Sequence, residues 1–164
     1  VETFLTGCPA ASLYAMLRGM QEAGMGTFSL GITEQLLDAR SLWLTPNTTT
    51  VYCAAEINVE HGPTVLEVPP GMLGPVDDAF FRWVTDVGFT GPDAGKGGKY
   101  LFLPPGHDGE VQGFQHVVRL RTFRNWLMMR AFVIDGDLAK TVAHVKQHWR
   151  LYPLADAASP PEPH

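Results

Sequence analysis

Between residues 41 and 135, short runs of β-branched and aromatic residues alternate with proline and glycine. Such runs, bounded by turn residues, are typical of β-strands. No helical segment of the right length separates one run from the next, so a doubly wound parallel sheet is disfavoured and an antiparallel arrangement is expected. The pattern predicts strands over residues 49–59, 64–68, 80–89, 99–103, 114–122 and 125–135.

Helical periodicity is found near the two ends of the chain. The spacing i, i+3, i+4, i+7 of Leu13, Met16, Leu17 and Met20 predicts an amphipathic helix. Pro9 would lie in its first turn and Gly24 just past its end. A weaker helix is predicted over 33–40, with Thr33 as its cap. A third helix would be capped by Asp135 or Asp137 and end at Pro153. The predicted class is therefore α+β and mainly β: an antiparallel sheet or β-sandwich with an N-terminal amphipathic helix and a C-terminal helix.

Composition limits the classes of partner. The 164 residues suffice for one domain with a real core, and 45% hydrophobic with 18% charged residues is ordinary for a folded protein. A net charge of −5 provides no basic surface for nucleic acid, and no apolar run is long enough to span a bilayer. An acidic domain with open sheet edges could also form a homodimer. Cys8 and Cys53 are expected to be buried free thiols.

The ends of the chain suggest a longer polypeptide. The sequence begins at Val1 without methionine and finishes with the proline-rich "ASPPEPH". We therefore expect a single β-rich domain over residues 1–154, followed over 155–164 by a linker towards a second domain.

The stretch "GPDAGKGGKY", residues 91–100, invites comparison with a phosphate-binding loop. Such a loop needs four residues between its first glycine and Gly-Lys, then Ser or Thr, and a helix after it. Here three residues intervene, Gly97 follows Lys96, and a strand is predicted next. We interpret the stretch as a tight connection between strands, with glycines supplying positive φ angles.

Other candidate sites are weaker. His144 and His148 share one face of the predicted C-terminal helix, but no third ligand is evident, so we predict solvated histidines and neither metal nor other cofactor. The acidic residues Asp77, Asp78, Asp86, Asp93 and Asp108 could include an acid/base pair, although aspartates also populate turns. The tryptophans, Trp43, Trp83, Trp126 and Trp149, are expected in the core; an exposed one would suggest a sugar platform.

Several ordered motifs resemble one bacterial family. They are "LTPNTTTVY", "GPTVLEVPP", "DDAFFRWVTDVG" and "GPDAGKGGKYLFLPPG", with "RLYPL" near the end. Together they resemble the family called domain of unknown function 1254 along nearly the whole chain. Thr49 departs from the resemblance, because an acidic residue is frequent there.

The resemblance implies a β-rich N-terminal domain that packs against a second β-sandwich, domain of unknown function 1214. It implies an exported or periplasmic protein, while the residues themselves leave a cytoplasmic location open. It supplies no established reaction and therefore no catalytic residues.

Two functions remain open from the sequence. The first is a structural or ligand-binding module that folds against a second domain and helps form a cleft for a sugar or small organic molecule. The side chains expected to line or brace that cleft are Asn47, Tyr52, Asp78, Arg82, Trp83, Asp86, Lys99 and Tyr100. The second is a hydrolase or lyase with Asp78 or Asp86 as the base.

Overall fold

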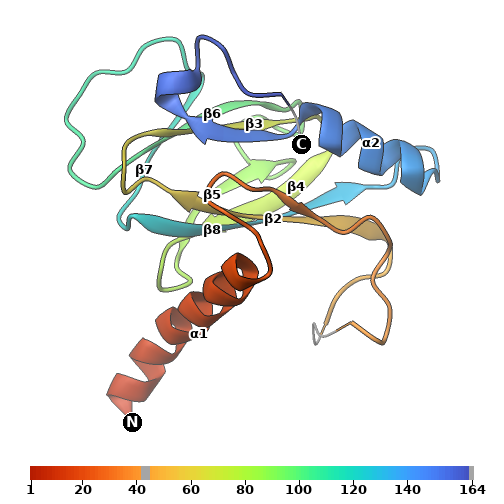
Figure 1. Cartoon of the computed structure of the whole chain (residues 1–164), viewed down its shortest axis with the longest axis horizontal. Helices are drawn as coiled ribbons and strands as arrows, with labels where there is room; N and C mark the ends of the chain where they lie inside the picture. The colour runs from red at the N-terminus through yellow and green to blue at the C-terminus, as the bar shows by residue number, and fades with distance from the viewer. Residues whose placement is uncertain (42–44, 163–164) are drawn as a thin grey trace.

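The fold is a sandwich of two β-sheets (Figure 1), seen in a computed structural model that describes residues 1–41 and 45–162. Sheet A has the strand order β1-β2-β8-β4-β5 with every neighbouring pair antiparallel, and sheet B has the order β7-β6-β3-β9. Only the β6–β7 pair is parallel among the described strands. Sheet A contains β1 (Gly31–Ile32), β2 (Thr50–Asn58), β4 (Met72–Asp77), β5 (Trp83–Gly88) and β8 (Arg124–Phe132). Sheet B contains β3 (Thr64–Val68), β6 (Gly98–Leu103), β7 (His116–Arg119) and β9 (Arg150–Pro153).

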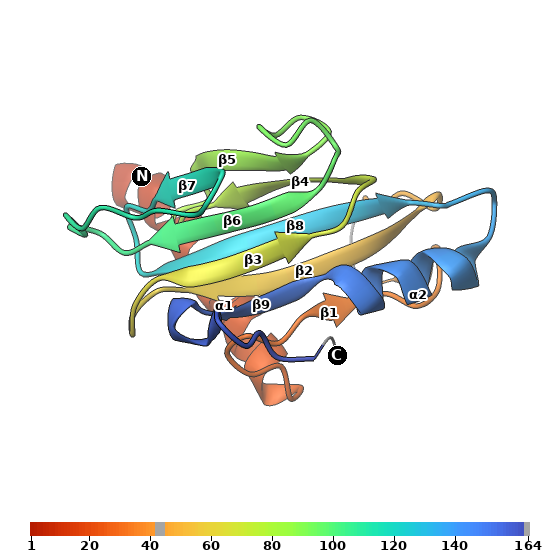
Figure 2. The same ribbon diagram turned by 90° about the horizontal axis from the view of Figure 1, so that it is seen from above.

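The main hydrophobic core lies between the two sheets. Alternate residues of each strand point inward, so Ile57 and Leu127 of sheet A meet Leu66 and Phe102 of sheet B, all fully buried. Figure 2 shows the strands of the two sheets lying over one another. The mainly β fold and the flanking helices predicted from the sequence are confirmed.

Helix α1 (Glu2–Glu22) crosses the outer face of sheet A. Its C-terminal half buries Leu13 and Leu17 against Ala54 and Trp126. The predicted apolar stripe is therefore confirmed, but the predicted start near Pro9 is wrong. Residues before Pro9 already form helical turns, as the bond from Leu5 N to Val1 O (3.0 Å) shows, and an internal proline removes one such bond without stopping the helix here.

Helix α2 (Leu138–His148) covers one end of the sandwich, where Val142 and Val145 enter the main core. Asp137, one of the two caps that the sequence left open, caps it through a bond from Lys140 N to its Oδ1 (2.9 Å). The predicted end at Pro153 is wrong. The helix ends at His148, because residues 150–153 extend as β9 and complete the open edge of β3.

Three further predictions need correction or qualification. Residues 33–40 are not helical: Thr33 N bonds Tyr52 O (2.9 Å), so its backbone joins β2 instead of opening a helix. The sequence pattern did not predict strand β4, because the dipeptide Gly74-Pro75 is typical of turns. Trp43 lies outside the described residues.

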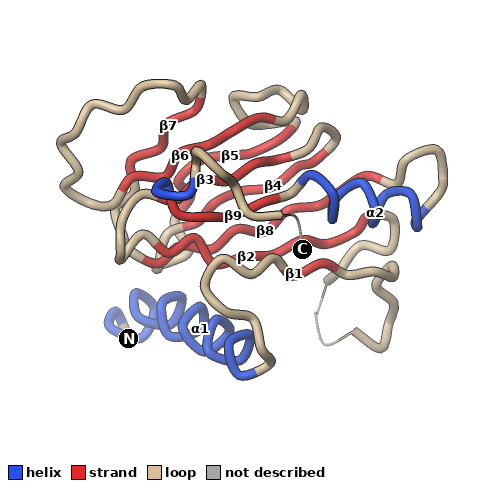
Figure 3. The backbone as a smooth tube through the Cα atoms, turned by 45° about the horizontal axis from the view of Figure 1, so that its top comes forward, coloured by secondary structure: helices blue, strands red, loops and turns tan. Residues whose placement is uncertain are grey.

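The short 3₁₀ helix η1 (Leu154–Asp156) follows β9, and Leu154 packs on the outer face of sheet B. Figure 3 distinguishes the helices from the strands of the two sheets and from the loops that connect them.

Candidate functional site

The most distinctive surface is the connection between β4 and β5, and Asp78 organises it. Asp78 is fully buried. Its Oδ1 accepts bonds from Phe80 N (2.8 Å) and Arg82 N (3.1 Å), and its Oδ2 accepts one from Arg82 Nε (2.8 Å). Both carboxylate oxygens are thus occupied by the turn that Asp78 begins, which is the role in turns that the sequence analysis set beside catalysis.

The turn holds aromatic side chains out in solvent. Trp83 is 62% exposed, and the Arg82 guanidinium carbon lies 5.0 Å from the centre of the Phe80 ring. Trp83 Nε1 donates to Asp86 Oδ1 (3.3 Å), and Arg121 Nη2 donates to Trp83 O (3.2 Å). The expectation of a core Trp83 is wrong, because Trp83 begins an edge strand; Trp126 and Trp149 are buried as expected.

Asp77 is the carboxyl group on this surface whose pKa is shifted by its surroundings. It is opposite Trp83 in the β4–β5 register. Partial burial, followed by the charges of Asp78 and Asp86, raises its pKa above the ordinary value. Asp77 is thus linked to the exposed indole through the strand register, and Asp86, which accepts a bond from that indole, acts on Asp77 through its charge. The sequence identified these residue types but not their proximity, because the register of β4 with β5 was not predicted.

Lys99 and Tyr100 do not join that surface, so the single cleft expected from the sequence is wrong in its geometry. Both lie on β6 of sheet B. Lys99 Nζ pairs with Glu67 Oε1 (2.8 Å), while Tyr100 is fully buried and its hydroxyl donates to Asp93. Burial, reinforced by the bond to Asp93, raises the pKa of Tyr100.

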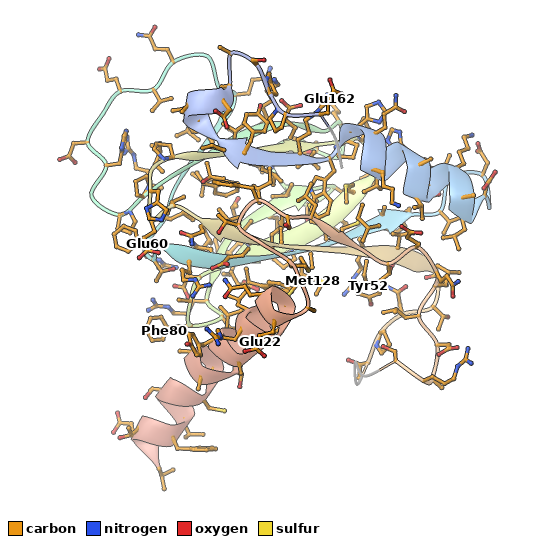
Figure 4. The ribbon with its side chains drawn as sticks, viewed as in Figure 1. Glu22, Tyr52, Glu60, Phe80, Met128 and Glu162 are labelled. Atoms are coloured by element: carbon orange, nitrogen blue, oxygen red, sulfur yellow. The ribbon has the colours of Figure 1, made fainter. Side chains whose placement is uncertain are left out.

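Asn47 and Tyr52 organise the entry to β2. Asn47 Oδ1 accepts bonds from Thr49 N (3.0 Å) and Thr50 N (2.9 Å), and Asn47 N donates to the Tyr52 hydroxyl (2.8 Å). Figure 4 labels Tyr52 and Phe80 towards opposite ends of the sandwich. A ligand role for this pair stays a prediction, separate from the β4–β5 surface.

The glycine-rich stretch is a closed loop around Asp93. Asp93 is buried, and its carboxylate accepts bonds from Gly88 N (2.7 Å), Gly97 N (3.1 Å) and the Tyr100 hydroxyl. Ala94, Gly95 and Gly97 have positive φ angles. The interpretation as a tight structural connection fits this geometry.

The thiols and histidines have separate settings. Cys53 is buried, which raises its pKa to about 12, whereas Cys8 is exposed on α1, contrary to expectation. The rings of His144 and His148 lie 4.7 Å apart. Within the described residues, no three His, Cys, Asp or Glu side chains gather as a possible set of metal ligands, and no helix is long and apolar enough to cross a membrane.

Replacing Glu67 with glutamine is expected to lower the free energy of unfolding by roughly 1–3 kcal/mol at pH 7. Glu67 is largely buried and accepts bonds from Lys99, Arg150 (3.2 Å) and the Tyr152 hydroxyl (2.5 Å). Burial opposes its ionisation, but these partners outweigh burial and lower its pKa. The stabilisation is therefore present above the unfolded pKa, about 4.3, and is lost as pH falls through the lower folded value.

Urea unfolding at pH 7 and pH 3 checks this expectation. The difference between Glu67→Gln and the parent should shrink at the lower pH. Glu34→Gln serves as control, because Glu34 pairs with Lys146 at the surface, with its side chain 62% exposed. An undiminished difference at pH 3 would show that the charge of Glu67 is not what matters.

The fold and this surface define the class of protein: a β-sandwich of two sheets whose β4–β5 connection carries exposed aromatic and acidic side chains. The chain belongs to the family described as "Protein of unknown function (DUF1254)", whose model matches residues 29–153. No curated protein matches the chain. Among solved structures, the crystal structure of the VPA0106 protein from Vibrio parahaemolyticus is similar in fold, with a TM-score of 0.76 and 19% sequence identity. The match covers 99% of this chain and 39% of that chain.

Proposed function

We propose that this chain is a non-catalytic module that docks a second domain on the outer face of sheet A and shares a ligand cleft with it. The observation that carries the proposal is a set of large apolar side chains left exposed on α1 and on the β4–β5 connection. We call this set the docking face; its members are Phe4, Leu5 and Tyr14 of α1 with Phe80 and Trp83 of the β4–β5 connection.

The first half of α1 needs a partner for physical reasons. It extends away from sheet A (Figure 1), and Phe4 and Leu5 are 71% and 64% exposed. Short helical segments without tertiary contacts are marginal in water. A partner that packs on this half would supply the apolar contacts that sheet A gives only to the second half, through Leu13 and Leu17.

The composition of the docking face is typical of protein interfaces. Aromatic residues and arginine are the residue types that contribute most binding energy when they are desolvated. Trp83 and Phe80 provide the aromatic centre, and Arg82, Asp86 and Arg121 provide a polar rim through the contacts already described. Figure 4 labels Phe80 on the same side of sheet A as Glu22 of α1.

The source of the partner is proposed to be further polypeptide of the same protein. A structure of the same fold belongs to a chain of which this one spans 39%. The exposed Trp83 indole beside the Asp86 carboxylate would lie at the seam. A flat apolar ring with an adjacent acceptor suits a sugar or a small hydroxylated molecule, which presents both an apolar face and hydroxyl groups.

Two polar substitutions in the intact gene product test the docking. Trp83→Ser combined with Phe80→Ser is expected to separate the domains, which small-angle scattering would record as an increased radius of gyration. Val117→Ser is the control, because Val117 is similarly exposed but lies on β7 of sheet B. An unchanged radius in the double variant would count against the docking face.

The alternative is a hydrolase or lyase with an aspartate base. The observation in its favour is the raised pKa of Asp77 beside Asp86. However, the larger pockets of the described region are lined by residues other than Asp77 and Asp86. This alternative predicts that Asp77→Asn and Asp86→Asn each abolish turnover by the intact gene product, whereas the docking module predicts no dependence on either carboxylate.

A further inference from the structure

A small pocket, partly open to solvent, lies at the end of the sandwich that α2 covers, away from the docking face. Its volume is about 180 Å³. The side chains that matter for its chemistry are Phe89 after β5, Phe132 at the end of β8, Val133 and Ile134 beyond it, and His144 and Val145 of α2. Figure 1 shows α1 outside sheet A and α2 at the right-hand end of the sandwich, so this pocket is separate from the surface proposed for the second domain.

One wall of the pocket is an aromatic pair held in place by the glycine-rich loop. The rings of Phe89 and Phe132 meet edge to face, with centroids 5.6 Å apart. A Cβ on Gly95 would lie 2.6 Å from Phe89 Cδ1, so only glycine lets the loop close against this ring. Gly71 N donates to Gly95 O (3.2 Å), which ties the loop to the pocket floor.

The part of the lining formed by Ile134 and Thr141 is also fixed before any ligand arrives. Ile134 N donates to Thr141 Oγ1 (2.8 Å), and Asp137 N donates to Ile134 O (2.8 Å). Val145, at the back, belongs to the main core. A pocket whose walls are already ordered binds a ligand without an added cost of ordering them.

His144 provides the pocket with a single ionisable side chain. Within the described part of the chain its imidazole makes no hydrogen bond to protein, whereas its backbone carbonyl faces His148 Nδ1 (2.8 Å). The other polar side chain, Thr141, already donates to Asp137 O (2.8 Å) and accepts from Ile134 N. A half-buried imidazole that packs beside the His148 ring but has no hydrogen-bond partner can satisfy one polar group of a ligand in this apolar pocket.

Size and chemistry together restrict the ligand class. An apolar protein cavity of roughly 150 Å³ accommodates one benzene molecule. A pocket of about 180 Å³ therefore accepts one ring with a small substituent. A sugar, which carries hydroxyl groups around its ring, would leave most of them unpaired against Phe89, Phe132 and Val145.

We propose that this pocket is a binding site for a small monocyclic aromatic molecule that carries one hydrogen-bonding substituent. The ring lies between the Phe89–Phe132 pair and Val145, and the substituent bonds the His144 imidazole. The site is independent of the proposed docking function, and either can fail without the other.

Titration of the 164-residue chain with phenol tests the site, followed by NMR of the His144 ring and of the methyl groups of Val133, Ile134 and Val145. Phenol is expected to shift these signals together, with a dissociation constant on the order of 1 mM. His144→Leu should weaken phenol binding roughly three- to tenfold, because one hydrogen bond is lost, and should leave benzene binding unchanged.

Two filling variants, Val133→Phe and His144→Trp, are expected to abolish the shifts while the thermal unfolding transition is retained. The proposal is overturned if phenol leaves the pocket signals unmoved at 50-fold the expected constant, roughly 50 mM. It is overturned equally if a folded filling variant binds phenol as the parent does, or if His144→Leu weakens benzene and phenol alike.

Discussion

Replacing Asp93 with alanine is expected to lower the free energy of unfolding by roughly 3–6 kcal/mol. Three donors, Gly88 N, Gly97 N and the Tyr100 hydroxyl, converge on its carboxylate. Alanine would leave them without an acceptor, and each buried unpaired donor costs roughly 1–3 kcal/mol. The loss would be a large part of the stability of a domain of this size.

Urea unfolding, followed by the fluorescence of the buried Trp149, measures this effect. Asp93→Asn retains one acceptor oxygen and should show an intermediate loss. Asp108→Ala is the matched control, because Asp108 is exposed in the neighbouring long loop. A loss for Asp93→Ala no larger than that for Asp108→Ala would mean that Asp93 does not hold the loop together.

Replacing Gly97 with alanine is expected to cost far more than the same change at Gly106. The two glycines have nearly the same φ, +74° and +75°, so the conformational cost of a side chain, roughly 1–2 kcal/mol, is common to both. They differ in surroundings. A Cβ on Gly97 would lie 2.4 Å from Val68 O and 2.8 Å from Pro70 N. A Cβ on Gly106 would have no described atom within 4 Å.

Thermal unfolding of the two variants separates conformational strain from close packing. Gly106→Ala should lower the melting temperature by a few degrees, roughly 4–8 °C per kcal/mol in small domains and less in one of this size. Gly97→Ala should lower it by at least twice as much, or prevent folding, because the obstructing atoms are backbone. Equal shifts would show that the loop can move away from β3 at little cost.

The sequence predicted the elements that depend on local pattern. Strand β2 and the stripe Leu13, Leu17 of α1 follow directly from periodicity, and both are confirmed. Strand β4 could not be predicted in this way, because its Gly74-Pro75 dipeptide is typical of turns. Gly74 is required there by close contact: a Cβ would lie 2.0 Å from Met128 O of the neighbouring strand.

The candidate surfaces depended on contacts between distant segments, which local patterns do not report. Residue type predicted that Lys99 and Arg82 line one cleft, but Lys99 lies on sheet B and pairs with Glu67 from the neighbouring strand β3. Trp83 was expected in the core because tryptophan is usually buried, and its position at the start of an edge strand overrides that tendency. The Asp93 network likewise joins residues from the β5–β6 loop, β5 and β6.

Hydrogen exchange of the intact gene product, compared with the 164-residue chain alone, tests the docking face most directly. The proposal predicts that amides in residues 2–12 and 79–83 exchange more slowly in the intact product, with exchange on β7 of sheet B unchanged. Equal exchange at these residues in both samples would contradict the proposed docking. This holds whether the gene product has a second domain or is no larger than this chain.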